Sequence, residues 1–404
     1  MLNVLMMVSW YLPKDGADHA GNFHYEQAMS LSKYCNIMIY YPYDRQVKQI
    51  EEGMEQGMRV WRSPYKLQNK IRNRMYMFRT MRRIVKSFHP DIIHAQVATE
   101  VGRFAIILGK IFHIPVMVTE HSTIEASGVL HFPLHQYADF VYRNSRYNAC
   151  VSEDLRRKLS EIFPRYQFHT IYNGIIVPQE PAVLTGQCSS EPEENGEQQK
   201  GTELSARYRI DGCVNFALVA SLYDREIKGI PMLLAVASRL KREGMRFTLH
   251  IVGDGAFRQE FEQTAARLGV GENCIFHGKA DKKKLYEILS QMDFLVSASK
   301  FESFGCTIAE AMMFGKPVVC TKSGGPESFV TKETGVLVER EDEEALYRGI
   351  REMMTHFREY QSDAIRAYAV EKFDMEKISR RYLEIYKCIM EKKYGIIRRG
   401  GRVW

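Results

Sequence analysis

One stretch of the sequence, residues 293–329, most constrains the kind of domain that this chain can form. Residues 294–298 are an apolar run of strand length, and residues 318–320 are a second one. Between them, three apolar side chains are spaced to share one face of a helix, namely Ile308, Ala311 and Met312. Gly315 follows as a helix stop. The stretch therefore predicts a strand, a loop, a helix and a second strand, with its loops at the carboxyl ends of strands, where open parallel sheets bind ligands.

Two carboxylates flank the start of this predicted helix. Glu302 lies in the loop before it, and Glu310 lies about one turn inside it. Backbone N–H groups at a helix start, here near Cys306 and Thr307, can hold an anion such as a phosphate. A carboxylate only accepts hydrogen bonds and suits pairs of sugar hydroxyls, so the arrangement fits a ribose, a diphosphate and a hexose in line. For either glutamate taken alone, the alternative is an ordinary solvated surface residue.

The residues around the two carboxylates form a longer pattern. It runs Glu-Ser-Phe-Gly from Glu302, Glu-Ala-Met from Glu310, Gly-Lys-Pro-Val-Val from Gly315, and Gly-Gly at 324–325. This string closely resembles the signature of retaining glycosyltransferases of family 4, which have the two-domain GT-B fold and use nucleotide-sugar donors. The resemblance implies that Glu302 approaches the transferred sugar and that Glu310 holds the nucleotide ribose. It also implies donor contacts at the helix start, from Phe304, Gly305, Cys306 and Thr307.

Length and composition are those of a globular protein with more than one domain. The chain has 404 residues, of which 45% are hydrophobic and 26% charged. We expect a Rossmann-like acceptor-side domain over 1–178, a polar insertion or linker over 179–206, and a nucleotide-sugar-binding domain over 207–370. A crossover helix and a basic tail are expected over 371–404. By the resemblance, the fold class is α/β, with two doubly wound domains facing a central cleft.

The cysteine pattern and the apolar segments bear on where the protein works. None of the eight cysteines forms a Cys-x-x-Cys pair, which favours reduced thiols over a disulfide framework. Residues 1–12 lack a basic start and are predicted to form the first strand rather than a signal peptide. The apolar run 104–118 is interrupted by Lys110 and His113, so it is too short and too polar to span a bilayer. We therefore expect a cytoplasmic protein.

Positive charge is concentrated in residues 56–90, which contain no acidic residue in a chain of net charge +7. The cations of this segment are Arg59, Arg62, Lys66, Lys70, Arg72, Arg74, Arg79, Arg82, Arg83 and Lys86. Apolar and aromatic residues are interleaved with them, as in a basic helix at a membrane surface. We predict peripheral contact with the inner, anionic face of a membrane, worth roughly 1 kcal/mol per cation, with a solvated helix face as the alternative. No nucleic-acid module accompanies the charge, so no nucleic-acid partner is expected.

In the first half, a glycine loop and two histidines are candidates for chemistry. The loop with Gly16 and Gly21 precedes a helix, and such loops suit an approaching phosphate; the resemblance assigns Gly21 to donor binding. Gly-x-Gly-x-x-Gly is absent here, which disfavours a nicotinamide enzyme. His94 and His121 both lie at predicted strand ends. We expect a structural hydrogen-bonding role for His94, whereas the resemblance places His121, in Thr-Glu-His-Ser, at the transferred sugar.

The second half offers cations for the donor diphosphate. Family members usually carry an Arg shortly after the first strand of this domain and a Lys before a Gly. Lys228, followed by Gly229, matches the Lys, whereas Ser221 occupies the usual place of the Arg. We predict that Arg225 replaces that Arg, with an exposed loop cation as the alternative.

The pattern and the resemblance predict a hexosyltransferase of polysaccharide biosynthesis that retains the anomeric configuration. Its donor is a nucleotide sugar, with a UDP-sugar expected ahead of a GDP-sugar, and its acceptor is a glycan or a lipid-linked molecule. No Asp-x-Asp occurs, so neither a metal nor another cofactor is expected, and cations meet the leaving diphosphate. A covalent intermediate and same-face attack both remain open. The alternatives are a GT-B sugar-nucleotide epimerase, a glycogen-phosphorylase-like enzyme and a non-catalytic membrane-associated scaffold.

Overall fold

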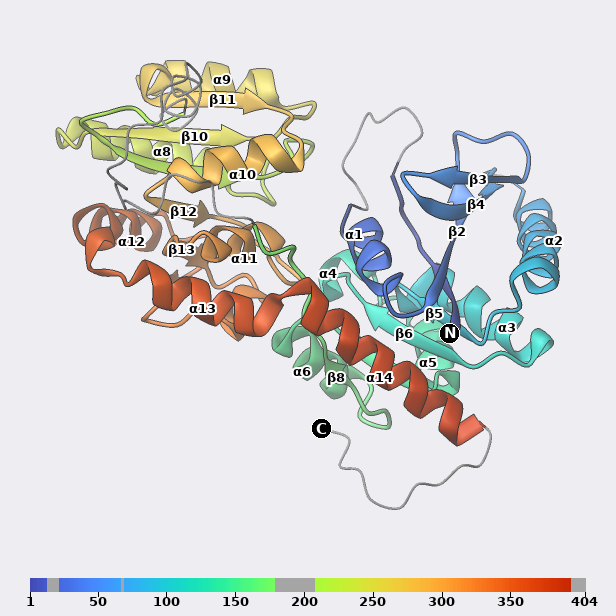
Figure 1. Cartoon of the computed structure of the whole chain (residues 1–404). Helices are drawn as coiled ribbons and strands as arrows, with labels where there is room; N and C mark the ends of the chain where they lie inside the picture. The colour runs from blue at the N-terminus through green and yellow to red at the C-terminus, as the bar shows by residue number, and fades with distance from the viewer. Residues whose placement is uncertain (13–21, 67–68, 179–207, 394–404) are drawn as a thin grey trace, which may run out of the picture. The chain divides into compact units, whose positions relative to one another are not determined.

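The chain divides into two compact units in a computed structural model that describes residues 1–12, 22–66, 69–178 and 208–393 (Figure 1). Unit 1 contains Met1–Ile176 and Phe373–Trp404, and unit 2 contains Val177–Lys372. The expected polar insertion and most of the basic tail lie outside the described residues. Both units are α/β.

Unit 1 is built on a sheet whose described strands follow the order β3-β4-β2-β1-β5-β6-β7-β8. The strands are β1 (Asn3–Met7), β2 (Asn36–Asp44), β3 (Glu51–Glu55), β4 (Met58–Pro64), β5 (Ile92–Ala95), β6 (Val116–Glu120), β7 (Tyr147–Cys150) and β8 (His169–Thr170). The helices are α1 (Asn22–Leu31), α2 (Lys70–Phe88), α3 (Arg103–Phe112), α4 (Ile124–Ser127), α5 (Leu134–Asn144), α6 (Glu153–Ile162) and α14 (Met375–Lys393), with a π-helical turn at Ala98–Gly102. Only β3 is antiparallel to its neighbour. The central strands are nearly continuous apolar runs, as expected where helices cover both faces.

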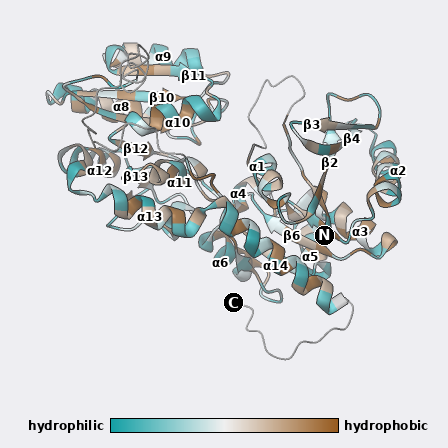
Figure 2. Cartoon of the chain, viewed as in Figure 1, coloured by the Kyte–Doolittle hydropathy of each residue, from teal (hydrophilic) through white to brown (hydrophobic). Residues whose placement is uncertain are grey.

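The last helix, α14, belongs to the core of unit 1 although it ends the chain. It packs beside α1. Its buried residues in this core are Ile378, Tyr382, Ile385, Tyr386, Ile389 and Met390. Their spacing of three and four residues forms one apolar face, and Figure 2 shows hydrophobic and hydrophilic residues alternating along the helix.

The chain enters α14 through a close contact with the end of the first segment of unit 1. Ile175 N donates to Phe373 O at 2.7 Å, and Met375 N donates to Ile175 O at 3.0 Å. A Cβ on Gly174 would lie 2.5 Å from Met375 Sδ and 2.9 Å from Met375 Cα. Only glycine leaves room for this approach, which explains the Asn-Gly sequence at this point.

Unit 2 is built on a fully parallel sheet in the order β11-β10-β9-β12-β13-β14. Its strands are β9 (Val214–Val219), β10 (Phe247–Val252), β11 (Cys274–Gly278), β12 (Phe294–Ser297), β13 (Val318–Thr321) and β14 (Gly335–Val338). Its helices are α8 (Ile230–Arg242), α9 (Arg258–Arg267), α10 (Lys282–Gln291), α11 (Cys306–Met313), α12 (Glu343–His356) and α13 (Ser362–Phe373). Buried residues of α8, α12 and the strands form one core. The stretch 293–329 folds as β12, a loop, α11 and β13, as predicted.

The basic segment 56–90 differs from its prediction as a helix throughout. Its first part is the strand β4, and only Lys70–Phe88 is helical. Arg62 therefore lies inside the protein, with 1% of its side chain exposed. Its guanidinium bonds Asp44 of β2 at 2.5 Å, Glu55 of β3 at 2.6 Å and the carbonyl oxygen of Leu12 at 2.7 Å. Arg62 joins three strands and adds nothing to the surface charge.

Replacing Arg62 with methionine should lower the free energy of unfolding by about 3–5 kcal/mol, because it leaves the buried carboxylate of Asp44 without its cation. Arg59→Met is the matched control, since Arg59 lies on the same strand and pairs with Glu52 at the surface. That change should cost about 1 kcal/mol or less. Urea unfolding of both variants measures the difference, and equal losses would contradict the role given to Arg62.

Candidate active site

In both units the strand order reverses at one point of the sheet, and in unit 2 residues named by the sequence lie there. In unit 2 this point lies between β9 and β12, which are adjacent although α8, β10, α9, β11 and α10 separate them in sequence. In unit 1 it lies between β1 and β5. The loops that leave two such strands run to opposite faces of the sheet and open a crevice at its carboxyl edge.

In unit 2 this geometry brings Lys228 and Glu302 together. Lys228 follows β9, Glu302 follows β12, and Lys228 Nζ donates to Glu302 Oε1 at 2.5 Å. Ser299 Oγ donates to the same oxygen at 2.9 Å. The two charged side chains remain 25% and 19% exposed, so a ligand can reach them. The sequence named both residues but did not show that they touch.

Two glycine positions allow the loops to approach this closely. Gly229 has φ 64°, and a Cβ there would lie 2.0 Å from Ala298 O at the end of β12. A Cβ on Gly325 would lie 2.4 Å from Phe304 O. Gly325 N instead donates to Glu302 O at 2.8 Å, which fixes the backbone of the carboxylate loop. Glycine at these positions is therefore part of how the Lys228–Glu302 pair is built.

The helix α11 starts directly after this loop. Gly305, with φ 96°, turns the chain into the helix, and Phe304 is buried against Phe329 at 5.3 Å between ring centroids. The positive end of the helix dipole therefore lies at Cys306 and Thr307. This anion-stabilising helix end therefore follows shortly after Glu302 in the sequence.

Glu310 lies one turn into α11 and is only 4% exposed. Lys282 Nζ, from the first turn of α10, donates to Glu310 Oε1 at 2.5 Å. A buried carboxylate requires such a partner. Lys282 was not named from the sequence, because it is one of three consecutive lysines and nothing in the neighbouring sequence distinguishes it.

The predicted phosphate cation Arg225 has another partner in the structure. Its guanidinium donates to Glu260 Oε2 at 2.8 Å, and 61% of its side chain is exposed. Its Cζ also lies 4.9 Å from the ring centroid of Phe257. These contacts are those of an exposed loop cation, and a diphosphate contact from Arg225 stays a prediction. Gly21, the predicted donor-side glycine of unit 1, lies outside the described residues.

In unit 1, His121 follows β6 and points into a cluster of buried polar side chains. His121 Nε2 lies 2.6 Å from Gln96 Oε1, and Gln96 Nε2 donates to Gln27 Oε1 at 3.2 Å. The amide oxygen of Gln96 therefore accepts from His121, which makes Nδ1 the acceptor nitrogen of a neutral ring. That Nδ1 is buried and has no hydrogen-bond partner among the described residues. Burial lowers the pKa of His121 to about 3, so the ring is neutral at physiological pH.

The buried carboxylate of Glu120 holds the turn that carries His121. It accepts from the backbone N–H groups of Ala98 at 3.0 Å, His121 at 3.1 Å and Ser122 at 3.0 Å. Burial raises the pKa of Glu120 despite these bonds. Neither Glu120 nor Gln96 was named from the sequence, because the contact of Glu120 with Ala98 and that of Gln96 with His121 join the segments after β5 and β6, which no local pattern shows.

His94 is fully buried in β5 and lies beside Gln96 of this cluster. One ring nitrogen lies 2.7 Å from Tyr386 Oη of α14, and the other lies 2.8 Å from Thr119 Oγ1 of β6. These contacts confirm the expected structural role. Burial lowers the pKa of His94 to about 3 as well, and it lowers that of the nearby His24 well below the usual range.

These histidines should make the protein sensitive to acid. They are neutral when folded and titrate near pH 6.5 when unfolded, so the unfolded state binds more protons below that pH. Stability is therefore lost as pH falls from about 6.5, by up to about 1.4 kcal/mol per pH unit for each histidine. Urea unfolding at a series of pH values tests this. His94→Gln should make the slope of stability against pH shallower than in the wild type.

Two family models match the chain, one in each half. A model described as Glycosyltransferase Family 4 matches residues 25–177, and one described as Glycosyl transferases group 1 matches residues 202–370. The first covers the strands that carry His121, and the second covers both members of the Lys228–Glu302 pair.

Characterised and uncharacterised proteins resemble the chain at moderate identity. An uncharacterized glycosyltransferase of Methanocaldococcus jannaschii is 27% identical over 295 residues, 70% of this chain and 72% of that protein. The alpha-monoglucosyldiacylglycerol synthase of Streptococcus pneumoniae is 27% identical over 248 residues, which span 58% of this chain and about half, 53%, of that protein. The crystal structure of Anabaena HepE in complex with UDP is 16% identical, and the match covers 96% of this chain and 100% of that chain with a TM-score of 0.72.

Proposed function

Because the chain belongs to the group 1 glycosyl transferases of glycosyltransferase family 4, which have the GT-B fold, we propose that it transfers a hexose from a UDP-sugar with retention of configuration. The acceptor is a glycan or a lipid-linked molecule, and no metal ion takes part. The observation that carries the proposal is the Lys228–Glu302 pair at the carboxyl edge of the unit 2 sheet. The HepE structure with UDP and the glucosyl-lipid synthase support the choice of donor and acceptor class.

Each proposed donor contact follows from the chemistry of the side chain. The ammonium of Lys228 has three N–H donors and can bond Glu302 and a phosphate oxygen together. The N-terminal end of α11 stabilises the negative charge of the leaving diphosphate. The carboxylate of Glu310 accepts about four hydrogen bonds, so it can hold Lys282 and ribose hydroxyls at once. Glu302 and His121 then contact the transferred sugar.

A transfer assay tests this function. The full chain is incubated with UDP-glucose labelled in the glucose, together with a panel of lipid-linked and soluble glycan acceptors. The expected product carries the label in an α-linkage, identified by its anomeric proton coupling. UDP release at an equal rate without any acceptor would instead indicate the epimerase alternative. Failure of UDP-glucose to react with any acceptor of the panel would contradict the proposal.

The helix α2 supports peripheral contact with an anionic membrane. Its exposed apolar residues Ile71, Met75 and Phe78 follow a spacing of four and three residues, and so form one stripe. The opposite side packs on the protein through Met77, Met81 and Ile84. Exposed cations flank the stripe, and the helix has no acidic residue. From this stripe and its flanking cations we propose surface binding at the cytoplasmic leaflet. None of the described helices could span a bilayer.

Replacing Arg74, Arg79 and Arg82 with glutamine should weaken binding to phosphatidylglycerol vesicles on the order of 100-fold, since each cation contributes roughly 1 kcal/mol. Cosedimentation measures the change. Arg242, Lys283 and Lys332 of unit 2 are exposed and give a control with the same loss of charge. Equal binding of both triple variants, or equal binding of the wild type to phosphatidylcholine, would rule out this role of α2.

A further inference from the structure

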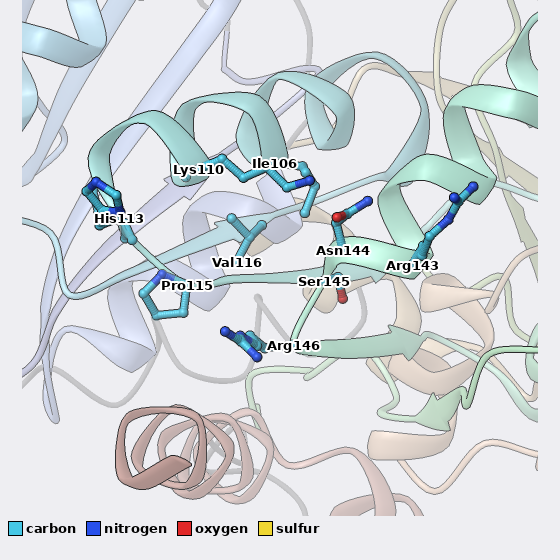
Figure 3. A pocket seen from close by; sticks show the side chains of 11 residues that line it. Ile106, Lys110, His113, Pro115, Val116, Arg143, Asn144, Ser145 and Arg146 are labelled. Carbon is cyan, nitrogen blue, oxygen red and sulfur yellow. The ribbon is translucent and has the colours of Figure 1, made fainter. Parts of the chain in front are cut away.

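Unit 1 contains a pocket away from the His121 cluster. It lies where α3 ends and β6 begins, and where α5 ends and β7 begins, with a volume of about 520 Å³. Figure 3 shows its side chains. Val116, in its wall, starts β6, whereas His121 follows the end of that strand. The length of the strand separates the two places by roughly 13 Å or more. The pocket is therefore at the amino edge of the sheet, opposite the edge that carries the proposed chemistry.

The ionisable side chains of this pocket are all basic, namely Lys110, His113, Arg143 and Arg146. No Asp or Glu lines it. Arg143 is bonded to Asp139 one helical turn before it, so its charge is compensated. Lys110 and Arg146 form no ion pair with any described residue. In Figure 3 they lie on different sides of the pocket, with Val116 and Pro115 between them in this view.

The negative ends of two helices offset only part of this positive charge. The carboxyl ends of α3 and α5 both meet the pocket, and a helix C-terminus carries about half a negative charge. The two ends together therefore offset about one cation. Lys110 and Arg146 supply two positive charges that no ion pair with a described residue compensates, and Arg143 is held by Asp139, so about one positive charge remains at the opening.

We propose that this pocket binds the phosphate group of an organic phosphate. Arg146 offers a planar guanidinium that can donate to two phosphate oxygens, and Lys110 offers a point charge from the other side. The apolar wall of Ile106, Pro115 and Val116 suits the carbon part of such a ligand. The volume lies in the range of pockets that hold small organic molecules and exceeds what a bare ion fills.

The neighbourhood of the pocket indicates two possible sources of this phosphate. The ring of Phe112, at the end of α3, stacks on Phe78 of α2 at 5.9 Å, and Ile111 beside it is 50% exposed. The exposed apolar stripe of α2 thus reaches the end of the helix that carries Lys110. A phospholipid headgroup is one source of the phosphate, and a soluble phosphate ester is the other.

The test uses the full chain and the double variant Lys110→Gln/Arg146→Gln. Both residues are exposed, so the variant should fold, and its melting temperature without ligand checks this. Arg242→Gln/Lys332→Gln in unit 2 is the control with the same change of charge. Glycerol 3-phosphate is titrated calorimetrically at constant ionic strength, and vesicles of phosphatidylglycerol or phosphatidylcholine are cosedimented. Because glycerol 3-phosphate can also enter the donor site of unit 2, the readout is the difference between the two double variants.

The proposal predicts that the pocket variant loses about tenfold or more in affinity for a phosphate probe, whereas the control variant does not. Weaker binding of both glycerol 3-phosphate and phosphatidylglycerol vesicles identifies a lipid headgroup. Weaker binding of glycerol 3-phosphate alone identifies a soluble ester. Equal behaviour of the two double variants toward every probe overturns the proposal. None of these readouts depends on sugar transfer, so their failure leaves the proposed function untouched.

Discussion

Replacing Lys228 with glutamine is expected to lower kcat/KM for the UDP-sugar by about 10²–10³-fold, the range found when a preorganised donor to developing charge is removed. The change takes away the ammonium that we propose meets the leaving diphosphate. It also removes the ion pair that positions the carboxylate of Glu302. Both losses act on the reacting complex, so kcat should fall along with kcat/KM.

Lys300 provides a closely matched control for this variant. It is 27% exposed, compared with 25% for Lys228, and it lies two residues before Glu302. Its ammonium pairs with Glu226 and Glu341 instead, at 3.0 Å each. Lys300→Gln should therefore change kcat/KM less than about threefold, as expected for a surface ion pair. Similar losses in the two variants would contradict the role of Lys228.

Replacing His121 with alanine is expected to lower kcat by about 10²–10³-fold, because the neutral imidazole is the proposed hydrogen-bonding contact to the transferred sugar. Gln96 acts on this ring as a positioning residue, through its 2.6 Å contact with Nε2. Gln96→Leu should cost about tenfold, since the ring stays but its tautomer is no longer fixed.

Gln96→Glu separates positioning from a merely structural effect. It keeps an acceptor for His121 Nε2 and adds a negative charge, which should raise the pKa of His121 from about 3 toward its usual range. Activity should then fall below about pH 6 in this variant, whereas in the wild type His121 sets no such limit. Steady-state rates from pH 5 to 9 measure it, with the exposed His131→Ala as control. An unchanged pH profile would show that Gln96 does not act through His121.

Sequence patterns predicted the elements around the donor site well because local signals agree there. The apolar runs, the helical spacing and the Gly315 stop all belong to one continuous segment, which folds as β12, α11 and β13. Lys228 was named through the family resemblance, as a Lys before a Gly, and the structure shows why Gly229 is needed: a Cβ there would collide with Ala298 O. The contact between Lys228 and Glu302 itself depends on β9 lying next to β12, which no local pattern contains.

What the sequence did not reveal depends on contacts between distant segments. Lys282 is one of three consecutive lysines, and only the packing of α10 beside Glu310 distinguishes it. The basic segment was predicted as a helix, but cross-strand partners place Arg62 in a buried strand. The crossover helix was expected to start at 371, whereas α13 continues to Phe373 and the chain breaks at Asp374, which pairs with Ile175, before α14. In each case contacts between distant segments selected one of several structures that the local sequence alone does not distinguish.

Unit 2 is proposed to hold a nucleotide sugar at the carboxyl edge of its sheet, with Lys228 on the diphosphate and Glu310 on the ribose. Thermal unfolding of the full chain with UDP-glucose, GDP-glucose or ADP-glucose tests it most directly. At about 100 times Kd, the correct donor should stabilise the protein by about 2.7 kcal/mol and raise its Tm, with UDP-glucose giving the largest shift. Lys228→Gln and Glu310→Ala should each reduce that shift, while Lys300→Gln should preserve it. No shift with any of the three sugars, or the same shift in all variants, would contradict the account.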